Sequence, residues 1–339
     1  MEILCLGLNH RTAPVEVRER FAVGTAKLGE ASHELVALAE AAEGVVISTC
    51  NRTEFYLAAE DARAAFGRVE TRLAEKIQMD SSVAAHFYRM EKTDAARHLC
   101  RVVSGLDSMM LGETEIFGQV KQAYQSALEA GATGVNLNKL FQRAFGVGKK
   151  VRTETSIQEG STSVGNVAVD LAEKIFGHLK NSEVMILGAG EMSRITAQSL
   201  VSRGAKSIFV TNRSFERAQE LASEMGGSAV RFDDWQSVLS RVDVVISSTG
   251  APHAIVHRAD VEKARRARKY RPLFFIDIAV PRDIDPAVGE IEEVYLYDID
   301  TLEQLAGEAQ AVFQPQIILH TGAVQIFNHV ISILTKNKS

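Results

Sequence analysis

The chain has 339 residues, enough for about two domains that each bury a core. It is 46% hydrophobic and 24% charged, has no apolar run long enough to span a membrane, and carries a formal charge of −5, so nucleic acid would have to bind local basic patches. Three scattered cysteines exclude a disulfide framework and a zinc site, and the N-terminus lacks a secretory signal, so we expect a cytoplasmic protein.

The first 155 residues predict an α+β domain. Residues 3–8 have the pattern of a strand, residues 29–43 that of a helix, and residues 45–48 and 54–57 that of paired strands. This β-α-β-β order is a ferredoxin-like start. From about residue 61 the pattern is mostly helical, with a glycine-punctuated interruption at SGLDSMMLGETEIFGQVK. Ser, Thr and Gly cluster between residues 155 and 165, so the first domain is expected to cover residues 1–155.

Residues 156–300 predict a second domain of another class. After a helix at 164–176, the apolar segments EVMILGAGEM, KSIFVTNRS, DVVISSTG and LFFIDIA alternate with helical segments. Strands that alternate with helices indicate βαβ units, and therefore a Rossmann-like, doubly wound parallel sheet in an overall α/β protein. Residues 301–339 predict a short C-terminal helical segment that is broken near Pro315.

The first turn of the second domain indicates a dinucleotide site. A strand precedes this turn and a helix follows it, which favours pyrophosphate binding over a tight turn without a ligand. The glycines allow the backbone to approach the phosphates closely. The predicted cofactor-binding residues here are Gly188, Ala189, Gly190, Glu191, Met192 and Ser193, the last in place of a third glycine.

The end of the next strand favours NADPH over NADH. A NAD site usually has an acidic residue there, which binds the ribose 2′-hydroxyl. This chain has Asn212, Arg213 and Ser214 instead, and a guanidinium with a hydroxyl suits a 2′-phosphate. The alternative is an exposed arginine at a helix start.

Cys50 is a candidate nucleophile because it follows a strand and lies two residues before Arg52. Positive charge beside a thiol favours the thiolate, although Arg52 could instead bind a substrate carboxylate. Cys5 and Cys100 lie in apolar segments and are expected to be buried. A nucleophilic cysteine and a nicotinamide cofactor in one chain suggest an acyl thioester that is reduced to an aldehyde by hydride.

Five segments in order resemble glutamyl-tRNA reductase, which catalyses the first step of C5 tetrapyrrole (haem and porphyrin) biosynthesis. They are GLNHRTAPVEVRERF, STCNRTEFY, SGLDSMMLGETEIFGQVK, ILGAGEM and DIAVPRDIDP, and the resemblance extends from residue 1 to about residue 300. It implies the NADPH-dependent reduction of glutamyl-tRNA to glutamate-1-semialdehyde, with Cys50 attacking the aminoacyl ester.

The resemblance also implies site residues. His98 matches a histidine that the family places near its active site, as a proton-transfer group; from the residues alone it reads as a core or helix-surface histidine. Arg52 would bind the glutamyl side-chain carboxylate, and a glutamate its α-ammonium. The implied substrate-binding residues are Thr49, Asn51, Arg52, Ser108, Glu113, Glu115 and Gln119.

The chain departs from the family in two places. Thr114 and Glu115 replace the usual Pro-Gln, and a carboxylate at position 115 would repel the substrate carboxylate unless it faces the ammonium or is protonated. Residues 301–339 do not resemble the helical dimerisation domain, so the homodimer usual in the family is not predicted. The family also implies an aminotransferase partner for the aldehyde.

Other interpretations stay open from the sequence. An NADP-dependent dehydrogenase of a small hydroxy acid, of the shikimate dehydrogenase type, would share the cofactor motifs without needing a cysteine. Semialdehyde dehydrogenases usually have the opposite domain order, and an NADPH-binding redox sensor is a third class. Two basic patches, at residues 265–271 and at Lys149, Lys150 and Arg152, are either solvated helix ends or contacts to tRNA.

Overall fold

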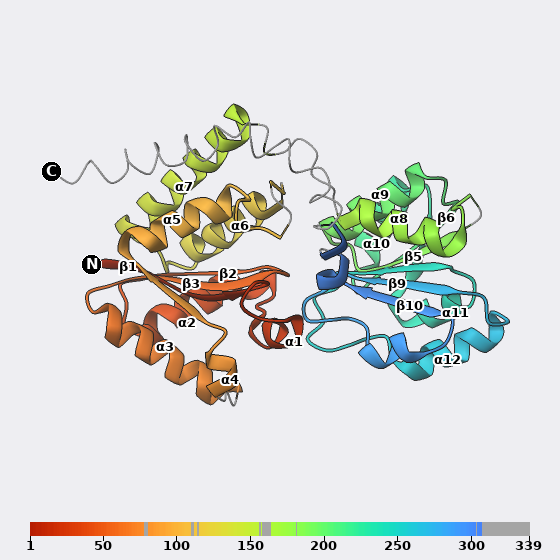
Figure 1. Ribbon diagram of the computed structural model, residues 1–339, viewed down its shortest axis with the longest axis horizontal. Coiled ribbons are helices and arrows are strands. Elements are labelled where there is room, and N and C mark those ends of the chain that lie inside the picture. The colour runs from red at the N-terminus through yellow and green to blue at the C-terminus, as the bar shows by residue number, and fades with distance from the viewer. Residues whose placement is uncertain are drawn as a thin grey trace. The chain divides into compact units, whose positions relative to one another are not determined.

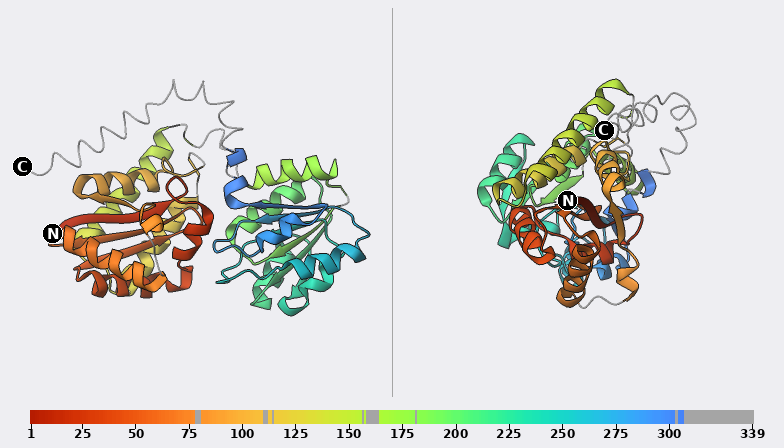
Figure 2. Two further views of the ribbon diagram at one scale, coloured as in Figure 1. Left: turned by 60° about the horizontal axis from the view of Figure 1, so that its bottom comes forward. Right: turned by 90° about the vertical axis from the view of Figure 1, so that its left-hand side faces the viewer.

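The computed structural model describes residues 1–77, 81–109, 112–113, 115–155, 157, 164–180, 182–302 and 304–306. These residues divide into two compact units, one within Met1–Ser161 and the other within Thr162–Ala306 (Figures 1 and 2). Most of the C-terminal helical segment expected at 301–339 lies outside the described residues. Within the described part of the chain, no helix is both long enough and apolar enough to cross a bilayer.

The first unit contains a four-stranded antiparallel sheet. Its strands are β1 (Glu2–Asn9), β2 (Glu43–Ser48), β3 (Arg52–Ala59) and β4 (Tyr88–Glu91), in the order β2-β3-β1-β4. This is the strand order of a complete ferredoxin-like sheet, which confirms the fold class expected for this domain. The sequence pattern did not reveal β4, because it is a four-residue edge strand with two exposed side chains.

Two layers of helices cover this sheet, as Figure 1 shows. One face packs against α2 (Leu28–Ala39) and α3 (Ala62–Ile77), and the other against α5 (Lys92–Val103) and α7 (Val135–Glu154). α6 (Glu115–Glu129) lies along the edge strand β2 and also packs against α2. The shorter elements of this unit are α1 (Val15–Arg18), α4 (Ser81–Ala84) and the 3₁₀ turns Glu19–Phe21 and Thr25–Lys27. The helix expected over 29–43 ends earlier, because Glu40 adopts a left-handed conformation (φ 49°) and residue 43 already begins β2.

Strand β3 is buried on both faces, and its side chains alternate between them. Phe55 and Leu57 point into the apolar layer below α2 and α3. Arg52, Glu54 and Tyr56 point to the opposite face, under α5 and α7. Charged groups therefore enter the core on one side of the strand only.

The second unit contains a six-stranded parallel sheet. Its strands are β5 (Glu183–Leu187), β6 (Ser207–Asn212), β7 (Ser228–Arg231), β8 (Val244–Ser247), β9 (Leu273–Asp277) and β10 (Val294–Asp298). The order β10-β9-β8-β5-β6-β7 is that of a doubly wound dinucleotide-binding sheet, as expected. Sequence patterns predicted the four central strands and missed β7 and β10, the two edge strands, which have partly exposed side chains.

Helices lie on both faces of this second sheet (Figure 2). They are α8 (Val164–Phe176), α9 (Glu191–Ser202), α10 (Phe215–Glu224), α11 (Trp235–Leu239) and α12 (Arg258–Ala267), with 3₁₀ turns at Phe232–Asp234 and Pro286–Glu290. The strand order reverses between β5 and β8, and ligands of such sheets bind at the carboxyl ends of the strands at this point. The fold therefore places a cofactor site beside the turn after β5.

Candidate active site and cofactor site

Cys50 lies at the tip of a two-residue hairpin turn that joins β2 to β3. Ser48 pairs with Thr53, and the Thr49 N–H donates to the Arg52 carbonyl at 2.9 Å, so Cys50 and Asn51 form the turn itself. The Thr49 hydroxyl accepts the Asn51 N–H at 3.1 Å. The thiol is half-buried, whereas Cys5 and Cys100 are buried. Cys50 is thus the accessible thiol, at the corner that the sequence indicated.

The segment after β1 holds this turn from one side. The Arg18 Nε donates to the Cys50 carbonyl at 3.2 Å, and its Nη1 donates to the Ala13 carbonyl at 3.2 Å. The His10 N–H donates to the Asn51 carbonyl at 2.9 Å. Arg18 is buried, so a fixed positive charge lies next to the backbone of the cysteine. Sequence reasoning missed Arg18 and His10, although both belong to the motif NHRTAPVEVRERF.

Arg52 is 1% exposed and lies inside an ion-pair network. Its Nη1 lies 2.5 Å from Glu54 Oε1, and its Nη2 donates to the Asp107 carbonyl at 2.7 Å. Tyr88 and Tyr56 donate hydroxyl hydrogen bonds to Glu54 at 2.6 and 2.9 Å. Burial by itself would raise the pKa of Glu54, but the nearby His98 and Arg52 hold it well below its ordinary value. Glu54 is therefore a buried carboxylate anion.

His98 lies between two carboxylates. Its Nε2 is 2.8 Å from Glu54 Oε1, and its Nδ1 is 3.3 Å from Asp107 Oδ2. Burial opposes the charged imidazole, yet Glu54 and Asp107 outweigh burial and raise the pKa of His98 to about 9. His98 is therefore an imidazolium at neutral pH, and its two N–H groups fix Glu54 and Asp107, which in turn hold Arg52.

Sequence reasoning missed Glu54, Asp107 and Tyr88. The signal for Glu54 was present: it is a charged residue in the middle of an apolar strand, two positions after Arg52 and hence on the same face. Asp107 accepts two hydrogen bonds from the Arg101 guanidinium, at 3.1 and 2.7 Å, which connects the network to the helical layer.

Cys5, Glu54 and His98 place a sulfur, a carboxylate oxygen and a ring nitrogen within 4.8 Å of one another. Such a set has the chemistry of a transition-metal site. The Glu54 oxygen that faces His98 also accepts from Arg52 and Tyr88, however. Because a guanidinium already neutralises this carboxylate, we interpret the cluster as an ion-pair network.

The loop before α6 brings more of the expected substrate residues to this network. Burial raises the pKa of Glu113, while contact with the Ser108 hydroxyl and the charges of Arg52 and Arg152 lower it in part. Ser108 is buried, and its hydroxyl lies near that carboxyl group. Ser108 and Glu113 are therefore grouped with Arg52, close to the turn that carries Cys50.

Glu115 and Gln119 lie in the first turns of α6, and both side chains are half-buried. Glu115 is the first residue of that helix, where a carboxylate interacts favourably with the helix N-terminus. Glu115 therefore stabilises the start of α6, and this role is independent of any contact with a substrate. Thr114 lies outside the described residues.

Two buried polar atoms near Cys50 have no hydrogen-bond partner among the described residues: His10 Nδ1 and Arg52 Nε. Buried polar groups without partners are costly and normally satisfied. Burial and the charges of Arg52, Arg11 and Arg18 lower the pKa of His10 to about 3, so its ring is neutral. The two atoms indicate a polar ligand site next to the thiol.

The turn between β5 and α9 has the geometry of a dinucleotide site. A Cβ on Gly188, whose φ is 99°, would lie 2.4 Å from the Ser248 carbonyl oxygen, and a Cβ on Gly190 would lie 2.5 Å from the Ser248 hydroxyl oxygen. Position 188 therefore requires glycine, whereas a side chain at position 190 would displace the Ser248 hydroxyl. The bare turn leaves the N-terminus of α9 open for a pyrophosphate.

The other predicted residues of this turn lie in and after it. Ala189 and Met192 are half-buried, and Ser193, which stands where a third glycine is usual, is fully buried. Glu191 is the first residue of α9, and its side chain is outside the described part. The pyrophosphate site expected in this turn is therefore formed by backbone groups and not by these side chains.

Asn212, Arg213 and Ser214 follow β6 as expected. Arg213 is exposed at the carboxyl edge of the sheet. The Asn212 side chain donates to the Ser214 carbonyl at 3.2 Å, and the Ser214 hydroxyl accepts the Arg217 N–H at 3.3 Å as the N-cap of α10. Of the three, Arg213 therefore presents the group most available to a ligand.

The basic patch at residues 265–271 is structural in part. The Arg268 side chain is fully buried, with Nη2 3.0 Å from Asp243 Oδ1 and 2.6 Å from the Pro272 carbonyl. Arg271 also pairs with Asp243, at 3.2 Å, and Arg265 with Glu292, at 2.9 Å. These contacts stabilise the second unit, while the side chains of Arg266 and Lys269 are exposed.

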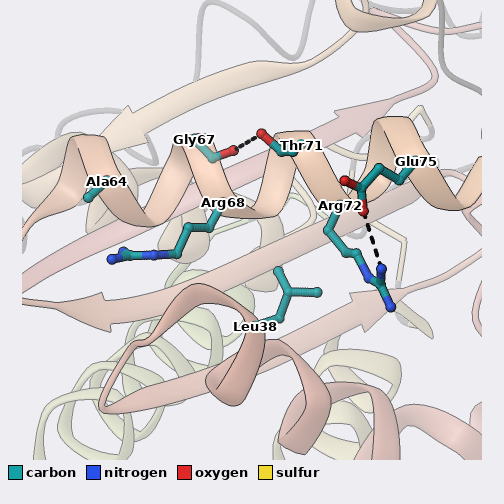
Figure 3. A pocket seen from close by; sticks show the side chains of 7 residues that line it. All are labelled: Leu38, Ala64, Gly67, Arg68, Thr71, Arg72 and Glu75. Carbon is teal, nitrogen blue, oxygen red and sulfur yellow. Dashed lines mark hydrogen bonds and ion pairs between the residues drawn. The ribbon is translucent and has the colours of Figure 1, made fainter.

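Two open hollows lie on the opposite face of the first sheet from Glu54. One, of about 540 Å³, follows α3 and is lined by Leu38, Ala64, Gly67, Arg68, Thr71, Arg72 and Glu75 (Figure 3). A larger one, of about 900 Å³, lies between α2 and α3 and includes Phe21 and Phe55. Figure 3 shows Arg72 turned onto Glu75, an ion pair of 3.2 Å. Neither hollow includes Cys50.

Comparison with known proteins agrees with both halves of the fold. Residues 6–155 match the model for the N-terminal domain of glutamyl-tRNA(Glu) reductase, and residues 170–305 match that for shikimate / quinate 5-dehydrogenase. The latter match and the glycine turn indicate a nicotinamide-type dinucleotide cofactor. The shikimate dehydrogenase interpretation thus applies to the second unit, whereas the first unit matches the reductase.

Whole-chain relatives cover both units. Glutamyl-tRNA reductase of Akkermansia muciniphila is 55% identical over 310 residues, 91% of either chain. That of Trichlorobacter lovleyi is 43% identical over 339 residues, 98% of this chain and 78% of its own. The solved glutamyl-tRNA reductase of Methanopyrus kandleri covers 99% of this chain and 80% of its own, with 38% identity and a TM-score of 0.50. The chain therefore belongs to the glutamyl-tRNA reductase family of oxidoreductases.

Proposed function

We propose that this chain reduces glutamyl-tRNA to glutamate-1-semialdehyde with NADPH, the first step of tetrapyrrole biosynthesis. The observation that carries the proposal is the half-buried Cys50 thiol on a hairpin tip that the buried Arg18 guanidinium holds by a hydrogen bond. Polar atoms of His10 and Arg52 without a hydrogen-bond partner lie beside it. Family membership supports the same reaction.

In the first step, the Cys50 thiolate attacks the ester carbonyl carbon that joins glutamate to the tRNA ribose. A carbon–sulfur bond forms, the carbon–oxygen bond to the ribose breaks, and the tRNA leaves as an alcohol after taking up a proton. The positive charges of Arg18 and Arg52 near the turn favour the thiolate. His10 stays neutral at this point, because its pKa of about 3 makes it a weak base, and its unpartnered Nδ1 is available for a hydrogen bond to the substrate.

Arg52 is the proposed partner of the glutamyl side-chain carboxylate. Glu54 and the Asp107 carbonyl use its two Nη groups, which leaves Nε buried without a partner. With His98 protonated, the cations Arg11, Arg52, His98 and Arg101 outnumber the anions Glu54 and Asp107 with which they pair. A substrate carboxylate would offset part of this excess charge and satisfy Nε.

His98 and Glu54 then act as positioning residues, because they hold the Arg52 guanidinium in one orientation. Glu113 is the proposed partner of the α-ammonium, since a cation beside it would offset the burial that raises its pKa. A direct role of His98 in proton transfer stays a prediction. As an imidazolium bonded to two carboxylates, it would act as an acid before it could act as a base.

The second step releases the aldehyde from Cys50. When bound, NADPH supplies the hydride for the thioester carbonyl, and the carbon–sulfur bond then breaks to return the thiolate. The Gly188–Gly190 turn would hold the pyrophosphate, and the exposed Arg213 the 2′-phosphate. Water must be excluded between the steps, because it would hydrolyse the thioester. The reactive product fits an aminotransferase as the next enzyme, a partner that the family resemblance implies.

Incubation with glutamate-labelled glutamyl-tRNA tests the proposal. Without NADPH, acid-stable label is expected on Cys50; with NADPH, free semialdehyde is expected. Cys50→Ser should lose both signals, whereas the matched control Cys100→Ala should keep them, because that thiol is buried in α5 with its pKa raised to about 12. Full turnover by Cys50→Ser would instead indicate a dehydrogenase that needs no covalent intermediate.

A further inference from the structure

Helix α7 has a basic outer face that the proposed chemistry does not use. The helix runs for 20 residues on the side of the first unit away from α2 and α3 (Figure 1). Its exposed side chains recur at helical spacing and form one stripe. The exposed residues of this stripe are Val135, Lys139, Gln142, Arg143, Gly146, Lys149, Lys150, Thr153 and Glu154.

The charge of this stripe stands out from that of the chain. The stripe contains four basic residues and one acidic residue, Glu154, a formal charge of +3, whereas the whole chain carries −5. Among the described residues, no carboxylate pairs with Lys139, Arg143 or Lys149. Lys150 has Glu154 at 3.8 Å, a weak exposed pair. The positive charge on this face is therefore largely uncompensated.

Arg152 does not belong to the stripe, although the sequence groups it with Lys149 and Lys150. It is half-buried, its Nη2 donates to the Glu113 carbonyl at 3.2 Å, and its guanidinium lies 4.7 Å above the Phe117 ring. Arg152 therefore holds the segment that contains Glu113, whereas Lys149 and Lys150 face solvent.

Gly146 lies in the middle of the stripe, and no packing contact within the protein requires a glycine at this position. A Cβ there would meet nothing within 4 Å, whereas a Cβ on Gly148 would lie 2.8 Å from the Val103 side chain. A glycine within a helix costs about 0.5–1 kcal/mol relative to alanine. Packing explains Gly148, but Gly146 leaves bare backbone between Arg143 and Lys150, where an external group can approach closely.

The stripe is directed toward the catalytic turn. At the start of α7, the Glu43 carboxylate accepts the N–H groups of Gly134, Asn136 and Leu137 at 2.7–2.9 Å, and Glu43 is the first residue of β2. β2 then leads to the Cys50 turn. At the other end of α7, Arg152 bonds to the Glu113 segment, which lies near Arg52. The helix therefore runs alongside β2, from the end far from Cys50 to the end near it.

We propose that the outer face of α7 binds the sugar-phosphate backbone of the tRNA, with Lys139, Arg143, Lys149 and Lys150 contacting phosphates that lead to the aminoacyl end at Cys50. This inference rests on the proposed function. Lys139 and Lys150 are separated by about 16 Å along the helix axis, enough for several successive phosphates. Backbone contacts of this kind give affinity without sequence preference.

The test compares two triple variants in the full chain. Lys139→Gln, Arg143→Gln and Lys150→Gln together should raise the Kd for glutamyl-tRNA about 10- to 100-fold near 0.1 M salt and reduce the salt slope of binding by about 2–3. The matched control, Arg63→Gln, Arg68→Gln and Arg72→Gln on α3, removes the same charge from the other face of the sheet. It should bind tRNA like the wild type.

A small substrate separates this proposal from the proposed function. The α-nitrophenyl ester of glutamate should acylate Cys50 equally fast in the wild type and both triple variants, because it carries no phosphate. If the wild type is acylated by neither this ester nor glutamyl-tRNA, the proposed function itself fails. Two other outcomes would contradict only the proposal that α7 binds tRNA, provided that the wild type is acylated. In one, the α7 variant keeps the tRNA affinity and the salt slope of the wild type. In the other, the α3 control loses as much tRNA affinity as the α7 variant.

Gly146→Gln gives an independent readout. A side chain there should leave the first unit equally or more stable, since Gln is a better helix former and the space is open. It should nevertheless weaken tRNA binding several-fold by blocking the backbone. Gly67→Gln in α3, another open helical glycine, is the matched control and should change stability only. Unchanged tRNA binding by Gly146→Gln would contradict a close approach at this position.

Discussion

His98 Nε2 lies 2.8 Å from Glu54 Oε1, and the two side chains are 6% and 0% exposed. The pair makes stability depend on pH. The folded pKa of His98, about 9, lies above its unfolded value of about 6.5. Its contribution is therefore fully present below about pH 6.5 and is lost as the pH rises through 9.

Hydrogen exchange of peptides from β3 and α5 at pH 6.5 and pH 9 measures this effect. Protection should fall at the higher pH in the wild type and change much less in His98→Asn. Fluorescence of Trp235, the chain's single tryptophan, reports the second unit and should not respond to the substitution. An equal loss of protection in His98→Asn would show that another group titrates.

Glu54→Gln should destabilise the first unit by about 3–5 kcal/mol, because it leaves the buried charges of Arg52 and His98 without their shared anion. The pKa of His98 should fall, since Glu54 is its main raising influence. Urea unfolding followed by first-unit hydrogen exchange gives the stability. Glu60→Gln, an exposed glutamate just after β3, should stay within about 0.5 kcal/mol of the wild type. Equal stabilities of the two variants would contradict the network.

Glu43→Gln should loosen the start of α7 and cost about 1–2 kcal/mol, because the Glu43 carboxylate accepts three backbone N–H groups there. These hydrogen bonds hold the pKa of Glu43 below its ordinary value, although burial acts in the opposite direction. The stabilisation is therefore present above about pH 4.3 and is lost as the pH falls toward the folded pKa. Exchange rates of the first amides of α7 check both points, and acid-insensitive rates would contradict the cap.

Arg18→Gln should lower the turnover number by about 10²-fold with a smaller effect on KM, because the Cys50 backbone loses the donor that fixes it. The rate of thiol alkylation at Cys50 should change as well. Arg20→Gln, two residues further on and exposed, is the matched control and should remain active. Normal turnover by Arg18→Gln would show that the turn holds its geometry unaided.

Arg213→Asp should shift the cofactor preference from NADPH toward NADH, because a carboxylate repels the 2′-phosphate and can bind a 2′-hydroxyl. The ratio of kcat/KM values for the two cofactors measures the shift. Arg217→Gln, exposed on α10, should leave that ratio unchanged. An unaltered preference in Arg213→Asp would mean that another group binds the phosphate.

The sequence predicted those parts of the fold where burial is regular. Strands β5, β8 and β9 are almost wholly apolar, β6 has an apolar centre, and the glycine turn follows β5, so the cofactor domain was recognisable. β4, β7 and β10 are short edge strands with exposed side chains, which gives them no comparable pattern.

The residues alone predicted the candidate site only at the thiol, where Cys50 and Arg52 lie two positions apart in a distinctive segment. The family resemblance added His98, Ser108 and Glu113. Arg18 and Asp107 were missed, because they meet the others only after the β1–β3 pairing and the packing of α5 bring distant segments together. The orientation of Arg152 likewise depends on contacts with Glu113 and Phe117 that spacing does not encode.

The hydrogen bonds that Arg18 and His10 donate to the carbonyl oxygens of Cys50 and Asn51 hold the hairpin tip through its backbone. These bonds do not depend on the side chain at position 50. A hydroxyl or selenol introduced there would keep this backbone support, so differences in rate among such variants would reflect the ionisation and nucleophilicity of the reactive atom.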